Sequence, residues 1–377
     1  MKRLFLRLLL VTVVAAAILA ACEAGVRLFF REGLSPEFLQ PEAGRAYFGA
    51  RMLRPVEEDG VRYAGREGAS VTIRGVEYAH DDALGLRVAP EAIEKPEGTF
   101  RIVVVGDSNA YGWGVPAEAT FARQVEAALR AAGRTADVAV LGFPGYNTGD
   151  QAALLRRLGP RLRPDLVLVA WFANDLERLG FHVDSGGWLF ADPLPLPDAW
   201  KPTLWRSFLY RRISVNEVSR MRDAGEYVLG EGPNLEFGEE KLLELSEVAR
   251  GLGARLAVVH VPPLEVVGAP PSTEEGAKDE PGEEGAAPAT ASGGGVDPRT
   301  LTLHPETVAG ARSGRWLKKV CGLYGFPHLD LLDAVIGVPA PLLWASPEHR
   351  DHHPNADAHR RFAEAIVPWL EEKGFLP

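Results

Sequence analysis

Two residue types that act together in nucleophilic catalysis stand far apart in this sequence. Ser108 follows the continuous apolar run RIVVVGD over residues 101–107, and His353 lies in the segment DHHPN over residues 351–355. A histidine beside a serine hydroxyl takes its proton as the oxygen attacks a carbonyl carbon, and returns that proton to the leaving group. The tripeptide GDS is also ordinary turn chemistry, so the serine is informative only in combination with other segments.

Two further segments carry hydrogen-bond donors suited to a developing oxyanion. GFPGYN covers residues 142–147 and WFAND covers residues 171–175, each at the end of an apolar run. A glycine lets the backbone N–H approach a bound group closely, and an asparagine side chain such as that of Asn174 is a known oxyanion donor. Each segment also has a plainer interpretation, as a strand-to-helix turn and as a helix cap.

In combination, the four segments resemble the blocks of the GDSL/SGNH hydrolase family. The family has GDS with the serine, a glycine block, G-x-N-D with the asparagine and D-x-x-H-P with the histidine; here they read GDSN, GFPGYN, FAND and DHHPN. The resemblance runs from Arg101 to Leu370, and the segments at 98–108, 111–115 and 164–167 look like membrane-anchored bacterial members. It implies a flavodoxin-like sheet, no metal or other cofactor, and ester hydrolysis or acyl transfer through an acyl-serine.

Mapped by motif, the resemblance makes Ser108 the nucleophile and His353 its base. The implied oxyanion hole consists of the Ser108 and Gly145 backbone N–H groups and the Asn174 side chain. One departure is Ala173, which replaces the glycine usually found before the asparagine.

The position of the aspartate that would orient His353 departs further from the family pattern. The family aspartate commonly lies three residues before the histidine, where this chain has Arg350. Asp351, two residues before His353, is the predicted acid that orients the imidazole, with a backbone carbonyl as the alternative. His352 is the alternative base, but His353 directly precedes the Pro-Asn pair.

The elements that must position these residues alternate along the chain. Apolar runs in which polar residues do not alternate with apolar ones are typical of strands buried on both faces. Strands that alternate with helices predict a parallel sheet covered by helices on both sides. The predicted fold class is α/β, a three-layer αβα sandwich of about five strands whose carboxyl ends carry the site. The strands are predicted over 101–107, 137–143, 164–171, 255–261 and 328–331, and the helices over 120–132, 149–162, 204–222, 239–252 and 357–372.

The chain divides into three parts by composition. Residues 1–25 are a signal or anchor, 26–98 a Pro/Gly-punctuated extension that packs on the main domain, and 99–377 the predicted hydrolase domain. Within it, the aromatic-rich segment 177–237 is a candidate lid, or in its helical half a helix packed on the sheet edge. Residues 269–297 are acidic and Pro/Gly-rich and predict a disordered insertion, because they hold too little apolar area to offset ordering.

The N-terminus predicts export. Basic residues precede an unbroken apolar run from Leu8 to Ala21, which as a helix rises about 21 Å, short of the roughly 30 Å hydrocarbon core. A span from Leu4 to Ala24 must tolerate Arg7 and Glu23. LAAC over 19–22 resembles a lipobox, so an uncleaved anchor and a lipidated Cys22 both stay open, and a signal peptide cleaved to give a free protein is the third alternative. All three place the catalytic part outside the cytoplasm, and the first two hold it on the periplasmic or extracellular side of a bacterial membrane.

Charge and missing motifs exclude several function classes. Half of the net charge of -10 lies in residues 273–284, and no basic face suited to nucleic acid remains. Three histidines near the C-terminus lack acidic or cysteine partners at metal-ligand spacing. The G-x-S-x-G elbow of α/β-hydrolases is missing, since Ser108 is followed by Asn109-Ala110.

The sequence therefore predicts a serine esterase that hydrolyses short-chain carboxylic esters of small molecules, glycans or lipids. The alternatives are an O-acyltransferase that acts on an envelope polysaccharide and a non-catalytic envelope-binding protein on the same fold. All four catalytic-type positions carry the expected residue type, whereas a non-catalytic relative would be expected to have lost at least one, which argues against the envelope-binding alternative.

Overall fold

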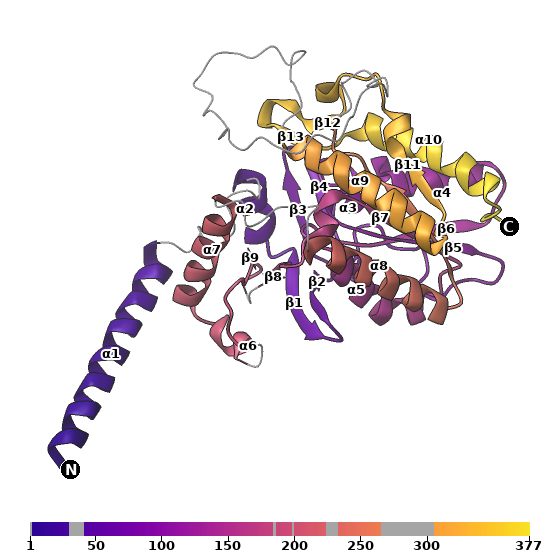
Figure 1. Cartoon of the computed structure of the whole chain (residues 1–377). Helices are drawn as coiled ribbons and strands as arrows, with labels where there is room; N and C mark the ends of the chain where they lie inside the picture. The colour runs from indigo at the N-terminus through magenta and orange to yellow at the C-terminus, as the bar shows by residue number, and fades with distance from the viewer. Residues whose placement is uncertain (1, 30–40, 184–185, 198–199, 224–232, 265–304) are drawn as a thin grey trace.

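A five-stranded parallel sheet forms the centre of the protein in the computed structural model, which describes residues 2–29, 41–183, 186–197, 200–223, 233–264 and 305–377 (Figure 1). The strand order is β11-β10-β7-β5-β6, and every neighbouring pair is parallel. The predicted α/β class with about five strands is confirmed. The strands are β5 (Phe100–Gly106), β6 (Ala136–Gly142), β7 (Leu166–Trp171), β10 (Arg255–His260) and β11 (His328–Asp330).

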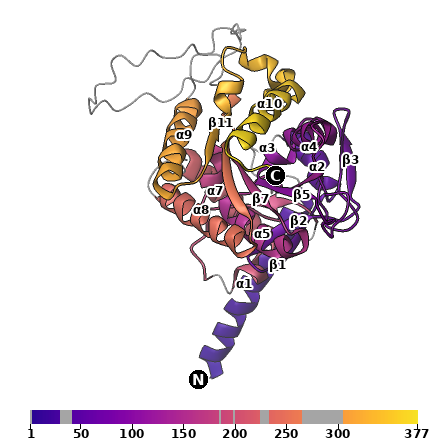
Figure 2. The same ribbon diagram turned by 90° about the vertical axis from the view of Figure 1, so that its right-hand side faces the viewer.

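The central strands are apolar over most of their length because helices cover both faces of the sheet. Val103 and Val105 of β5 point into one core, and Ile102 and Val104 point into the other, as the two-residue period of a strand requires. The first core is shared with α5 (Thr148–Leu162), α8 (Pro233–Gly251) and α9 (Pro305–Tyr324), and the second with α4 (Phe121–Ala131) and α10 (Ala356–Glu372). Figure 2 shows these layers from the side.

Residues 41–98 pack on the first core. They form α2 (Pro41–Gly49) and two antiparallel hairpins, and the polar sequence pattern does not predict the helix. Tyr47, Tyr63 and Tyr78 are buried in the same cluster as the strands of the main sheet. The hairpin strands are β1 (Leu53–Glu58), β2 (Val61–Gly65), β3 (Ser70–Ile73) and β4 (Val76–Ala79).

The aromatic segment after β7 is divided into short elements. It holds β8 (His182–Val183), β9 (Leu189–Phe190), α6 (Lys201–Leu204) and α7 (Phe208–Asp223). The helix predicted over 204–222 is α7, which begins four residues later than predicted. It begins after Ser207, whose hydroxyl accepts the Tyr210 N–H at 3.1 Å and so caps the helix. The predicted insertion at 269–297 lies outside the described residues, and a lid over 177–237 stays a prediction.

The C-terminal segment crosses the carboxyl edge of the sheet before the last helix. The chain passes through η6 (Leu331–Ala334), η7 (Ala340–Leu342), β12 (Trp344–Ser346), η8 (Pro347–His349) and β13 (Asp351–Pro354). β12 and β13 pair antiparallel, and Asn355 then caps α10 by accepting the Ala358 N–H at 3.0 Å. At the other end of the chain, α1 (Lys2–Phe29) projects away from the domain in Figure 1.

Candidate active site

Ser108 lies in the turn that follows β5. Asp107 caps the short helix α3 (Ser108–Tyr111) by accepting the Asn109 N–H at 2.8 Å, so Ser108 is the first helical residue. A side chain at Gly106 would lie 2.6 Å from Ala110 Cβ, so only glycine allows the turn to fold this tightly. The serine is 8% exposed, at the carboxyl edge of the sheet, where parallel α/β sheets carry their sites.

His353 reaches Ser108 from the β12–β13 hairpin. Its Nε2 lies 2.9 Å from Ser108 Oγ, and its Nδ1 lies 2.6 Å from Asp351 Oδ1. The Asp351 carboxylate accepts, so Nδ1 carries the proton and Nε2 accepts from the serine hydroxyl. Asp351 is 2% exposed, so its charge faces the imidazole rather than water.

His352 lies apart from this chain of contacts. Successive side chains on a strand point to opposite sides, and the His352 ring packs on Trp344 with centroids 4.3 Å apart. The structure thus brings His353 to Ser108. It also brings Asp351 to His353, while Arg350, at the usual position of the aspartate, takes a left-handed backbone with φ of 52°.

Two of the three predicted oxyanion donors, Gly145 and Asn174, follow the strands on either side of β5. Gly106 is in register with Gly142 of β6 and with Ala170 of β7, so the three turns begin at the same level. Gly145 has φ of 83°, and a Cβ there would lie 2.9 Å from the Phe181 ring. Glycine is therefore required on both conformational and steric grounds.

Asn174 lies in η3 (Ala173–Leu176), directly after β7, and is half-buried. Its side chain hydrogen-bonds Asp107, the residue that caps the serine turn. Its buried Oδ1 has no hydrogen-bond partner among the described residues. The amide is therefore held against the base of the serine turn.

Two acidic side chains are fully buried beneath these turns. Burial raises the pKa of Asp107, against hydrogen bonds from the Asn109 N–H and the Asn174 side chain that lower it. Burial and the nearby charge of Asp107 raise the pKa of Asp175 well above its usual range. Asp175 accepts from Gln151 Nε2 at 2.6 Å and the Phe172 N–H at 2.9 Å. These bonds fix the turn that carries Asn174.

The extension before β5 supports the serine turn from behind, which the sequence patterns do not indicate. The Arg87 guanidinium donates to the Tyr111, Gly112 and Val115 carbonyl oxygens at 3.1, 2.5 and 2.5 Å, where α3 ends. It also stacks 4.3 Å from the centroid of Tyr78, whose hydroxyl accepts the Gly114 N–H at 2.8 Å.

This support extends to the histidine. Trp113 lies in the loop that Arg87 holds, and its ring packs 6.2 Å from that of His353, between centroids. Arg87 itself is 7% exposed. A lone arginine in a polar extension gives no sequence signal of such a role, because the carbonyls that it binds are invisible in the residue pattern.

We expect Arg87→Met to lower kcat on an ester substrate by about 10- to 100-fold, since small misplacements of reacting groups cost this much. The substitution leaves buried carbonyls without donors, so the melting temperature should fall as well. Steady-state kinetics measured well below the variant's melting temperature separate the two effects. The control is Arg54→Met, which removes an exposed ion pair with Glu67 and should change little. An unchanged kcat for Arg87→Met would contradict a positioning role.

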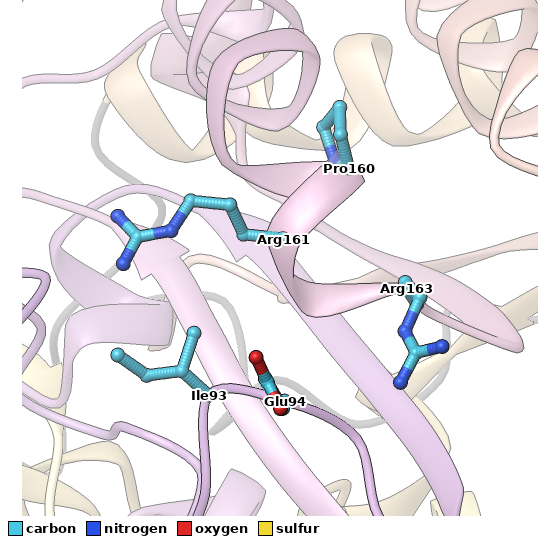
Figure 3. A pocket seen from close by; sticks show the side chains of 5 residues that line it. All are labelled: Ile93, Glu94, Pro160, Arg161 and Arg163. Carbon is cyan, nitrogen blue, oxygen red and sulfur yellow. The ribbon is translucent and has the colours of Figure 1, made fainter.

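A hollow of about 700 Å³ lies at the opposite edge of the sheet. Figure 3 shows its lining residues, Ile93, Glu94, Pro160, Arg161 and Arg163, which precede β5 or close α5 and so stand where β5 and β7 begin. None of the predicted site residues lines it. Within the part of the chain that the structure describes, no group of three His, Cys, Asp or Glu side chains is placed to hold a metal ion.

Comparison with known proteins places these residues in one family domain. Residues 104–361 match the GDSL-like Lipase/Acylhydrolase family. This match spans Ser108, Gly145, Asn174 and His353, while Arg87 lies before it. No curated protein matches the sequence.

Several solved structures resemble the chain. TesA is 15% identical over 73% of this chain and 99% of that chain, with a TM-score of 0.42. The psychrotrophic esterase EstA from Pseudoalteromonas sp. is 12% identical over 72% and 97%, with a TM-score of 0.40. The acetyl xylan esterase AlAXEase is 12% identical over 71% and 98%, with a TM-score of 0.40.

Proposed function

We propose that this chain, which belongs to the GDSL-like lipase/acylhydrolase family and is an ester-bond hydrolase, works through an acyl-enzyme on Ser108. His353 acts as general base and Asp351 orients it. The observation that carries this proposal is the continuous contact from Ser108 Oγ to His353 Nε2 at 2.9 Å and from His353 Nδ1 to Asp351 at 2.6 Å. Residues 245 positions apart meet with the geometry that proton transfer needs.

In the acylation step, Ser108 Oγ forms a bond to the ester carbonyl carbon while its proton passes to His353 Nε2. The carbonyl oxygen gains the negative charge, and the Ser108 and Gly145 backbone N–H groups and the Asn174 side chain donate to it. The C–O bond of the ester then breaks, and the leaving alcohol takes the proton from His353. Asp351 stabilises the imidazolium that forms between these steps.

Deacylation repeats the same steps with a different nucleophile. Water loses a proton to His353 and attacks the acyl carbon, and Ser108 leaves with its proton restored. If a sugar hydroxyl replaces water, the same residues transfer the acyl group. Hydrolysis is the leading proposal. O-acyl transfer to an envelope polysaccharide is the alternative.

The substrate is proposed to be a short-chain ester on a small molecule, glycan or lipid, reached outside the cytoplasm. The support for this location is α1. The segment from Arg3 to Phe29 is long and apolar enough to cross a membrane: an 18-residue stretch of it has a mean hydropathy of 2.6, and none of that stretch is buried. A helix of this kind near the N-terminus is also what a signal sequence looks like, so membrane attachment rests on the apolar length alone.

The acyl-enzyme is tested by trapping it. Full-length protein is mixed with p-nitrophenyl acetate, quenched in acid and digested, and the peptide that carries Ser108 is weighed by mass spectrometry. We expect a gain of one acetyl group on that peptide and an initial burst of p-nitrophenol. Acetylation spread over other residues with no burst would contradict the nucleophile assignment. Product analysis with a glycan acceptor present then separates hydrolysis from transfer.

A further inference from the structure

Glu23, which directly follows the long apolar run of α1, has a specific partner. Its carboxylate accepts from the Phe208 and Leu209 N–H groups, both at 2.9 Å, and from Ser207 Oγ at 2.7 Å. These groups are the first turn of α7, where the N–H groups have no partner within the helix. Glu23 therefore caps α7 from another helix, and the positive end of the α7 dipole favours its charge.

Neighbouring residues complete this contact. Arg27 donates to Glu23 at 2.7 Å, and its guanidinium lies 4.6 Å from the centroid of the Phe208 ring. Val26 is 9% exposed. One side of α1 is thus packed on the folded domain at Glu23 and Val26, while Leu28 and Phe29 at its end and the apolar residues from Leu4 to Leu19 are exposed.

The charge state of Glu23 is consistent with this packing. Burial raises the pKa of Glu23, but the hydrogen bonds from Leu209, Phe208, Ser207 and Arg27 lower it to about 2. A carboxylate whose folded pKa lies below its unfolded value of 4.5 stabilises the contact above pH 4.5, and loses this contribution as the pH falls toward 2. The joint is therefore fully charged at neutral pH.

The length of α1 leaves little room for a linker. From Leu4 to Cys22 the helix rises about 28 Å, close to the roughly 30 Å of a hydrocarbon core. Glu23 follows immediately, so the membrane boundary and the contact with α7 coincide. A lipidated Cys22 gives the same result, because it would place the acyl chains one residue before Glu23.

The face of the domain beside this joint carries exposed apolar side chains. Trp200 is 62% exposed at the start of α6 and Leu196 is 37% exposed just before it. α6 and α7 lie on the side of the domain from which α1 leaves (Figure 1). Tryptophan is enriched at membrane–water interfaces, where its ring contacts both the apolar and the polar layer.

We propose that Glu23 fastens the membrane segment directly to α7 and so holds the face around Leu196 and Trp200 against the lipid surface. The proposal rests on the proposed membrane attachment of α1. It requires that the mature chain keeps Glu23.

The joint is tested by hydrogen–deuterium exchange on the full-length protein in nanodiscs. We expect Glu23→Ala to speed exchange of the Phe208 and Leu209 amides by about fivefold or more, the usual effect of a lost helix cap. Glu42→Ala is the matched control, since Glu42 is exposed on α2 and its nearest basic group lies 3.6 Å away. Equal exchange in Glu23→Ala and wild type would overturn the joint.

Lipid contact is measured on the same particles. A fluorophore on Trp200→Cys should lose about half of its emission or more to lipids with spin-labelled headgroups. Wild-type protein labelled in parallel gives the contribution of the exposed Cys22, which is left in place as a candidate lipid anchor. The comparison label is Lys373→Cys, on an exposed site beyond α10, and should be unaffected. Equal quenching at both sites would overturn the lipid-facing surface. Recovery of wild-type protein without membrane would instead refute the membrane attachment itself, which separates the two failures.

Discussion

Ser108→Ala is expected to lower kcat on p-nitrophenyl acetate by about 10⁴-fold or more, because the acyl-enzyme route is lost and only binding and oxyanion contacts remain. The substitution removes one oxygen from a side chain that is 8% exposed, and the melting temperature should stay close to wild type. The measurement is initial rate against substrate concentration, with circular dichroism to confirm the fold.

Ser346→Ala is the matched control for this variant. Ser346 is 7% exposed and lies on β12, the strand that pairs with β13. Its hydroxyl contacts Glu348 and His349 rather than Ser108, His353 or Asp351. It should retain most activity. A Ser108→Ala enzyme that keeps more than about a tenth of the wild-type kcat would mean that ester cleavage proceeds through another nucleophile.

The second large effect is expected for His353→Ala, which removes both the base and the acid of the two proton transfers. A loss of about 10⁴-fold or more in kcat follows, similar to that of the serine variant because the residues act as a unit. Rates are measured at several pH values, so that hydroxide-driven cleavage at high pH is recognised. The double variant Ser108→Ala/His353→Ala should be no worse than either single variant.

His352→Ala serves as the internal comparison, one residue away on the same strand. Its ring lies on Trp344, so we expect the variant to keep kcat within a few-fold and to lose some thermal stability. The reverse order, with His352→Ala inactive and His353→Ala active, would refute the assignment of the base.

The sheet and the order of the site residues are predictable because the local signals agree. Each of the runs that form β5, β6 and β7 is apolar on both faces, and that pattern arises when helices cover a parallel sheet on both sides. Since such strands end at a common edge, the residues after them must gather there. Ser108 and Asn174 are predicted together for this reason before any distance is known.

The choice between the two histidines depends on structure that the sequence patterns leave undetermined. Residues 351–354 form a strand of a small hairpin, and the alternation along that strand turns His352 away from Ser108 and His353 toward it. The segment is too short for its period to be recognised. The same strand explains the acid: Asp351 lies on the same side as His353, two residues away.

Contacts between distant segments were likewise not predictable. Arg87 binds backbone carbonyls, which every sequence contains, and Glu23 binds backbone N–H groups at the start of α7. The patterns start the helix over 204–222 four residues too early because the apolar spacing continues there. α7 begins at Phe208, where Glu23 accepts from the Phe208 and Leu209 N–H groups.

The location of His353 in the last tenth of the chain sets the order in which activity can appear during biosynthesis. The strand that precedes Ser108 and its neighbours β6 and β7 are made first, whereas His353 lies on β13, directly before α10, which packs on α4. The Phe121 N–H, which donates to His359 Nδ1 at 3.1 Å, joins these two helices. Under the proposed mechanism, a chain that ends before β13 lacks the proton acceptor, and we expect ester cleavage only from the completed polypeptide.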